Sequence, residues 1–135
     1  MRSRKVILDT NLWVSFLITK NMYFLDEYIT SGKFKLIFSK ELIQEFITVS
    51  SRQKFARYFT DEDIENLLIV LNNYGTVINV TSNIKLCRDS KDDFLLNLAI
   101  DSKANYLVTG DKDLLEIGKI KRTKILTIKE LQDLL

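Results

Sequence analysis

The chain contains no histidine and no proline, and it has one cysteine and four glycines among its 135 residues. The absence of histidine excludes Ser-His-Asp and Cys-His catalysis and the usual zinc sites. The single cysteine, Cys87, has no partner for an internal disulfide, which agrees with a reducing compartment. Catalysis must therefore use carboxylates, hydroxyls, lysine, arginine or the thiol. A bound metal would be a hard cation such as Mg²⁺ or Mn²⁺.

Long apolar runs are also absent. No stretch reaches the length of about 18 apolar residues that a membrane span requires. The first apolar stretch, Val6–Leu8, is interrupted at once by Asp9, so it is too short for a secretory signal. We therefore expect a cytoplasmic protein without a membrane span. Because no Pro-rich or Gly-rich linker is visible, residues 1–135 are expected to form a single domain.

Short apolar runs alternate with helical patterns along the chain. Strands are expected at Lys5–Leu8, Lys33–Phe38, Thr76–Val80 and Asn105–Thr109, with an edge strand at Lys124–Leu126. Helices are expected at Leu12–Ile18, Tyr23–Thr30, behind an N-cap at Ser39, at Phe55–Phe59, from Ile64 to near Gly75, at Phe94–Ile100, at Leu114–Ile117, and behind a capping box at Thr127. This alternation indicates the α/β class, with a parallel sheet covered by helices on both faces.

Acidic residues fall where the expected strands end. Asp9 directly follows the first strand, Asp111 follows the fourth after one glycine, and Asp92 and Asp93 open the helix that leads into the fourth. Glu45 lies two turns into the helix after the second strand, and it reaches the same edge if that helix leans over it. Ligands of such sheets bind outside the carboxyl ends of the strands. Carboxylates gathered there repel one another unless a cation neutralises them, so the pattern predicts a divalent metal site.

Each acid also has an ordinary structural explanation. Asp9 and Asp111 suit turns or helix caps, and acids such as Asp92 and Asp93 are favoured in a first helical turn by the helix dipole. Glu45 lies to one side of an apolar stripe, where a glutamate is normally a solvated surface residue. The metal hypothesis therefore depends on the coincidence of all these acids at one sheet edge.

Four segments, in this order, resemble the motifs of PIN-domain ribonucleases. They are Val6–Asn11, Ser39–Phe46 with Glu45 as its acid, Cys87–Asp93 followed by Leu95–Ala99, and Leu107–Leu115. The four motifs occur in the same order as in the family and span nearly the whole chain. The sequence resembles above all the PIN proteins that serve as toxins of toxin–antitoxin pairs (VapC-like). Ser90 stands where the third motif usually has proline, which we expect to change the turn and not the metal chemistry.

The resemblance implies a three-layer α/β/α sandwich around a parallel sheet of about five strands in the order 3-2-1-4-5. It implies Mg²⁺- or Mn²⁺-dependent hydrolysis of RNA, with a cognate antitoxin protein and a second copy of the chain as partners. Carried over by position, the catalytic and metal-binding acids are Asp9, Glu45, Asp93 and Asp111, with Glu45 acting through a water. The resemblance does not decide firmly whether Asp93 or its neighbour Asp92 is the metal ligand. Supporting roles, such as positioning water or substrate, fall to Thr10, Asn11, Asp92, Thr109 and Asp113.

Other functions remain open from the sequence alone. A haloacid-dehalogenase-like phosphatase would use Asp9 as its nucleophile, but it needs a second acid two residues further on, where Asn11 stands. A PIN domain that has lost catalysis would bind RNA or act as a scaffold, although all four acids are present here. A homodimer would bury apolar side chains of the early helices, which are equally consistent with the core: Trp13, Phe16, Leu17, Tyr23 and Phe24.

Overall fold

A computed structural model describes most of the chain. The described residues are 3–19, 27–29, 31–52, 60–62, 65, 69, 73, 75–85 and 90–134. The expected helix at Phe55–Phe59 and the thiol of Cys87 lie outside them. The helices expected at Tyr23–Thr30 and from Ile64 onwards are described only in part, and residues 27–29, 65 and 69 are helical as expected.

The described strands form one sheet with the order β3-β2-β1-β4-β6-β5. Five of them are parallel, namely β1 (Arg4–Leu8), β2 (Phe34–Phe38), β3 (Gly75–Val77), β4 (Tyr106–Val108) and β6 (Thr123–Leu126). They confirm the expected order, with β1 at the centre between β2 and β4. Strand β3 is shorter than the expected Thr76–Val80, because Val77 pairs with Phe38, the last residue of β2.

The sheet has a sixth strand that the sequence did not predict. Strand β5 (Lys119–Ile120) runs antiparallel to β6 and covers the edge at which Lys124–Leu126 was expected. The turn between the two strands places Lys121 at φ 53°, in the left-handed region. That conformation usually requires Gly or Asn, so a lysine there carries no sequence signal for a hairpin.

The described helices are α1 (Thr10–Thr19), α3 (Lys40–Ser50), α5 (Ser90–Ser102), α6 (Lys112–Ile117) and α7 (Ile128–Leu134). Helices α3 and α7 begin directly behind their predicted caps, whereas α1, α5 and α6 begin two to four residues before the expected positions. The Ser39 hydroxyl accepts a hydrogen bond from the Leu42 N–H at 3.1 Å, which confirms it as the N-cap of α3. The capping box of α7 is complete, because Thr127 N–H donates to Glu130 Oε1 at 3.1 Å and Glu130 N–H donates to Thr127 Oγ1 at 3.2 Å.

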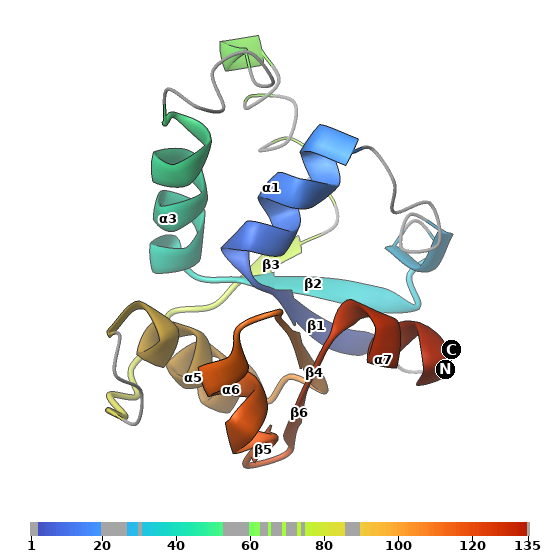
Figure 1. Cartoon of the computed structure of the whole chain (residues 1–135), viewed down its shortest axis with the longest axis vertical. Helices are drawn as coiled ribbons and strands as arrows, with labels where there is room; N and C mark the ends of the chain where they lie inside the picture. The colour runs from blue at the N-terminus through green and yellow to red at the C-terminus, as the bar shows by residue number, and fades with distance from the viewer. Residues whose placement is uncertain are drawn as a thin grey trace.

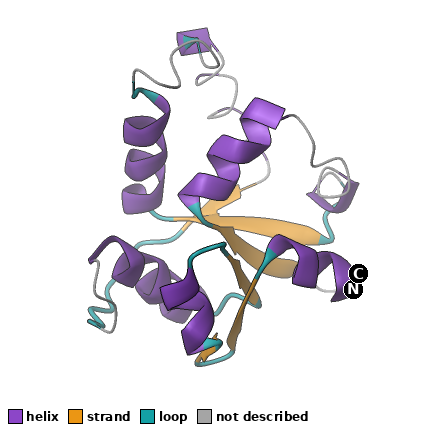
Figure 2. Ribbon diagram, in the orientation of Figure 1, coloured by secondary structure: helices purple, strands orange, loops and turns teal. Residues whose placement is uncertain are grey.

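Helices flank the sheet on both faces (Figures 1 and 2). Helices α1 and α3 lie together on one face, and α5 and α6 lie on the other. The change of face follows from the strand order, because right-handed crossovers to β2 and β3 run one way from β1 and those to β4 and β6 run the other. The strands β1, β2 and β4 are buried between these layers, with Ile7 and Leu107 fully covered. None of the described helices is long and apolar enough to cross a bilayer.

Helix α5 holds the segment that follows β3. Its Asp101 carboxylate accepts hydrogen bonds from the Thr81 N–H at 2.6 Å, the Ser82 N–H at 2.9 Å and the Ser82 hydroxyl. These bonds, led by that of the Ser82 hydroxyl, lower the pKa of Asp101 below its ordinary value of 3.8. One turn earlier, Asn97 Oδ1 accepts from the Ile84 N–H at 2.8 Å. Asp101 and Asn97 of α5 thereby hold the segment that follows β3. Asp92 lies at the opposite end of this helix, in its first turn.

Candidate metal centre

An acidic cleft opens at the carboxyl ends of the central strands. It has a volume of about 230 Å³. Its lining comes from four parts of the chain: Asp9, Thr10 and Asn11 after β1, Glu45, Val49 and Arg52 on and after α3, Asp92, Phe94 and Leu95 of α5, and Asp111 after β4. Because β1 lies between β2 and β4, the segments that follow these three strands meet at one edge. Four of the acids that the sequence analysis selected, Asp9, Glu45, Asp92 and Asp111, therefore meet at this edge.

Asp9 stands between β1 and the first turn of α1. Its backbone carbonyl accepts hydrogen bonds from the N–H groups of Leu12 at 3.0 Å and Trp13 at 3.2 Å, so the helix starts from this residue. Its own N–H donates to the Val108 carbonyl at 3.0 Å, which ties it to the end of β4. These backbone bonds hold the Asp9 carboxylate at the centre of the sheet edge.

The Thr109 hydroxyl connects the acids that follow β1 and β4. It donates to Oδ2 of Asp9 at 2.7 Å and accepts from the N–H of Asp111 at 3.1 Å. Thr109 is 1% exposed, and both bonds are partly buried. This hydroxyl joins Asp9 to Asp111, and the expected role of Thr109 in positioning water or substrate stays a prediction.

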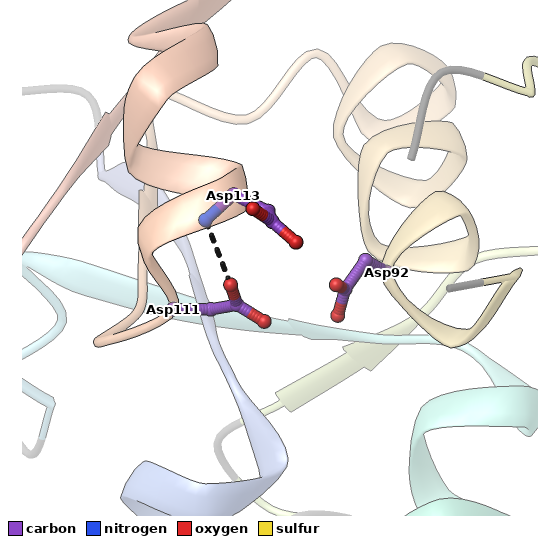
Figure 3. A group of neighbouring side chains, drawn as sticks. All are labelled: Asp92, Asp111 and Asp113. Carbon is purple, nitrogen blue, oxygen red and sulfur yellow. Dashed lines mark hydrogen bonds between the residues drawn. The ribbon is translucent and has the colours of Figure 1, made fainter. Parts of the chain in front are cut away.

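Three carboxylates gather beside the start of α6. Asp111 is the N-cap of this helix, and its Oδ1 accepts from the Asp113 N–H at 2.9 Å. Oxygens of Asp92, Asp111 and Asp113 all lie within 4.8 Å of one another. Figure 3 shows the three side chains directed into one space between the starts of α5 and α6. Asp92 and Asp111 also line the cleft, whereas Asp113 is exposed at its outer side.

The structure brings Asp92, and not Asp93, to the cleft. Asp92 is half-buried in the lining, while Asp93 is 8% exposed and does not line it. Successive residues of a helix point about 100° apart, so the first turn of α5 can direct only one of the two carboxylates to the cleft. The residues that meet are therefore Asp9, Glu45 and Asp111 together with Asp92, the neighbour from which the resemblance did not separate its preferred acid, Asp93.

Glu45 reaches the cleft from the flank of α3. The helix buries Leu42, Phe46 and Val49, and Glu45 is half-buried beside them, whereas Glu41 is exposed. Arg52, which the sequence analysis did not select, lines the cleft as well. The signal was present, because Glu45, Val49 and Arg52 follow one another at intervals of four and three residues, which places them on one face of a helix.

The pKa of the Asp9 carboxyl is raised above its ordinary value of 3.8. Desolvation by burial is the largest cause, and the negative charge of Asp111 raises the pKa further. Hydrogen bonds from Thr109 and from the backbone at Asn11 and Thr10 act in the opposite direction. Ionised Asp9 is therefore an incompletely compensated buried charge, which a cation in the cleft would stabilise.

Thr10 adds a second polar group in need of a partner. Its side chain is 3% exposed, and among the residues that the structure describes its hydroxyl has no hydrogen-bond partner. A water or ligand in the cleft would satisfy it. The donors that line the cleft are carboxylate, hydroxyl and amide oxygens, and the chain has no histidine. This donor set fits a hard divalent cation such as Mg²⁺ or Mn²⁺.

The sheet order and the acidic cleft define an α/β protein with its polar centre at the carboxyl ends of β1 and β4. The chain matches the family model of the PIN domain over residues 5–113. The protein therefore belongs to the PIN-domain family. The matched region contains every acid of the cleft, and the resemblance seen in the sequence motifs is confirmed.

Comparison with individual proteins agrees with this family. The chain is 32% identical over 117 residues to an uncharacterized protein of Methanocaldococcus jannaschii, which covers 84% of this chain and 74% of that protein. The fold of the present chain is similar to that of the PIN domain endonuclease Utp24, with a TM-score of 0.59 and 21% identity. The similarity covers 92% of this chain and 84% of the Utp24 chain. The present chain is also similar to VapBC2 from Rickettsia felis, solved with a DNA fragment from its promoter, with a TM-score of 0.55 and 15% identity over 90% of this chain and 96% of the other.

Proposed function

We propose that this protein is a metal-dependent endoribonuclease that hydrolyses phosphodiester bonds of RNA with Mg²⁺ or Mn²⁺. The observation that carries the proposal is the meeting of Asp9, Glu45, Asp92 and Asp111 in one cleft. Membership of the PIN-domain family supports the same reaction class. The phosphatase alternative finds no support in this cleft, because Asn11 supplies an amide where a second acid would be needed.

The residues of the cleft divide into three tasks. Asp9, Asp92 and Asp111 would hold the cation, and Glu45 would orient the attacking water from the side of α3. When bound, the cation activates water and neutralises the charge that develops on the phosphate and the leaving oxygen. Thr109 holds the Asp9 carboxylate in position relative to Asp111 through its two hydrogen bonds. Thr10 and Asn11 lie beside Asp9, where they would contact water or the substrate phosphate.

The biological role we propose is that of the toxin in a toxin–antitoxin pair, held inactive by a cognate antitoxin protein. The similarity of the fold to VapBC2 supports this role. A homodimer stays a prediction. Trp13, one of the apolar residues that suggested it, is 6% exposed and packs against Phe38 with 5.6 Å between ring centroids. The side chains of Phe16 and Leu17, and residues 23 and 24, lie outside the described structure.

A cleavage assay tests the proposed activity. Purified protein is incubated with a labelled single-stranded RNA in Mn²⁺, in Mg²⁺ and in EDTA, beside Asp111→Asn prepared in the same way. We expect cleavage with either metal, none in EDTA, and a loss of at least about a hundredfold in the variant. Equal cleavage by wild type and Asp111→Asn would identify a contaminating nuclease and refute the proposal. Intact RNA with wild type in both metals would favour a non-catalytic RNA-binding domain.

A further inference from the structure

Arg52 is the one basic residue in the lining of the acidic cleft, as far as the chain is described. Helix α3 ends at Ser50, and the Arg52 N–H donates to the Val49 carbonyl at 3.2 Å in the turn that follows the helix. Seven residues separate it from Glu45, which corresponds to about 10 Å along a helix axis. Helix α3 and the turn that follows it therefore present an acid and a guanidinium to the same cleft at two distinct positions.

The Arg52 guanidinium is not used to hold the fold together. In the part of the chain that the structure describes, it forms no ion pair and no side-chain hydrogen bond, although four carboxylates line the same cleft. Its side chain is exposed. A guanidinium presents a planar set of donors that matches two oxygens of a phosphate. This one is available for a ligand.

The charge of the cleft explains why such a group is needed. When ionised, Asp9, Glu45, Asp92 and Asp111 carry four negative charges, and the RNA backbone is itself anionic. Two divalent ions would only neutralise these four carboxylates. Arg52 would then give the cleft its net positive charge, so it attracts the substrate that the acids alone would repel.

We propose that Arg52 binds a phosphate of single-stranded RNA that neighbours the scissile phosphate. The proposal rests on the proposed nuclease function and assigns a further substrate-binding subsite to it. The scissile phosphate lies at the acids near Asp9, and the separation between Glu45 and Arg52 leaves the guanidinium for an adjacent phosphate. Loss of this contact weakens binding of substrates that contain the second phosphate, and it leaves the chemical step unchanged.

The test compares Arg52→Ala and Arg52→Lys with a matched control, Arg122→Ala. Arg122 is exposed in the turn between β5 and β6, so its replacement removes the same charge outside the cleft lining. One substrate is an RNA oligonucleotide, and the other is a dinucleotide with a single phosphodiester. A charged hydrogen bond contributes about 1.5 kcal/mol at the low end, which corresponds to roughly a tenfold change in KM.

We expect Arg52→Ala to raise KM for the oligonucleotide about tenfold with little change in kcat, and to leave the dinucleotide unaffected. Arg52→Lys should restore part of the affinity, since it keeps the charge but loses the planar donors. The slope of log K against log salt should fall by about 0.7 in Arg52→Ala. Arg122→Ala should behave as wild type in each measurement.

Three results would overturn the proposal. Equal losses on both substrates, or a lower kcat at constant KM, would place Arg52 at the reacting centre or in the fold. Unchanged kinetics in Arg52→Ala, while Asp111→Asn is inactive, would refute the subsite and leave the nuclease intact. If wild type cleaves no RNA, the nuclease proposal fails on its own, and fluorescence anisotropy with the oligonucleotide in Ca²⁺ still decides whether Arg52→Ala binds more weakly.

Discussion

An asparagine substitution at Asp92 should remove most of the stabilisation by metal, whereas the same substitution at Asp93 should leave it unchanged. A cation that binds only the folded chain stabilises it by about 2.7 kcal/mol at a hundred times its Kd. For 135 residues, an unfolding entropy of about 2.1 cal/mol/K per residue gives roughly 280 cal/mol/K. The cation should therefore raise the wild-type Tm by about 10 °C. If Asp92→Asn weakens binding about a hundredfold, the same metal concentration contributes only about 0.4 kcal/mol, a rise of about 1–2 °C.

The measurement is a melting curve at pH 7 in EDTA and in Mn²⁺ at a hundred times the wild-type Kd. Asp93→Asn is the matched control, since it removes the same charge from the neighbouring position, outside the cleft lining. We expect this variant to keep the rise of about 10 °C, whatever its Tm in EDTA. A rise preserved in Asp92→Asn but lost in Asp93→Asn would contradict the orientation of α5 and return the metal to the residue chosen from the sequence. No rise in wild type would exclude a divalent site.

Three further predictions concern Asp9, Thr109 and Asp101. Because burial raises the folded pKa of Asp9, the metal-free protein loses stability as the pH climbs from about 3.8 through that folded pKa. In EDTA, urea titrations should therefore find Asp9→Asn more stable than wild type at pH 7, with no advantage below pH 3.8, and a destabilised variant at pH 7 would contradict this. Thr109→Val should cost about 1–2 kcal/mol and most RNA cleavage, because the bonds to Asp9 and Asp111 are lost, while Thr109→Ser keeps both functions. Because the pKa of Asp101 is lowered, its ionised carboxylate stabilises the fold fully above pH 3.8. This stabilisation is lost as the pH falls through the folded pKa. Asp101→Asn should lower Tm by about 2 °C at pH 7 and by less at pH 3, and an equal loss at both would show that its charge is irrelevant.

Features that depend on a few neighbouring residues were predictable from the sequence. The Ser39 cap and the Thr127–Glu130 capping box each involve partners three positions apart, and both occur as expected. The order of the five parallel strands came from the resemblance to a family and not from the local pattern. The end of β3 was misplaced, because it is set by the last residue of β2, Phe38, which is distant in the chain.

The composition of the site was predictable only in part, for similar reasons. The motif around Asp92 and Asp93 contains two adjacent acids, and only the rotation of α5 about its axis decides which one faces the cleft. The hydrogen bond from Thr109 to Asp9 joins residues 100 positions apart, so no local pattern reports it. Arg52 lies outside the matched motifs, although its spacing from Glu45 was visible.

The pairing of β4 with β1 determines at which point of synthesis the cleft can form. Strand β1 pairs on one side with β2, which follows within about 30 residues, and on the other with β4, which begins at Tyr106. A nascent chain on the ribosome can therefore pair β1, β2 and β3 long before Thr109 and Asp111 have been made. Asp9 and Glu45 therefore stay apart from Asp111 until β4 and the residues that follow it have been made. A fragment that lacks β4 has no complete cleft, so under the proposed nuclease function an unfinished chain should cleave no RNA.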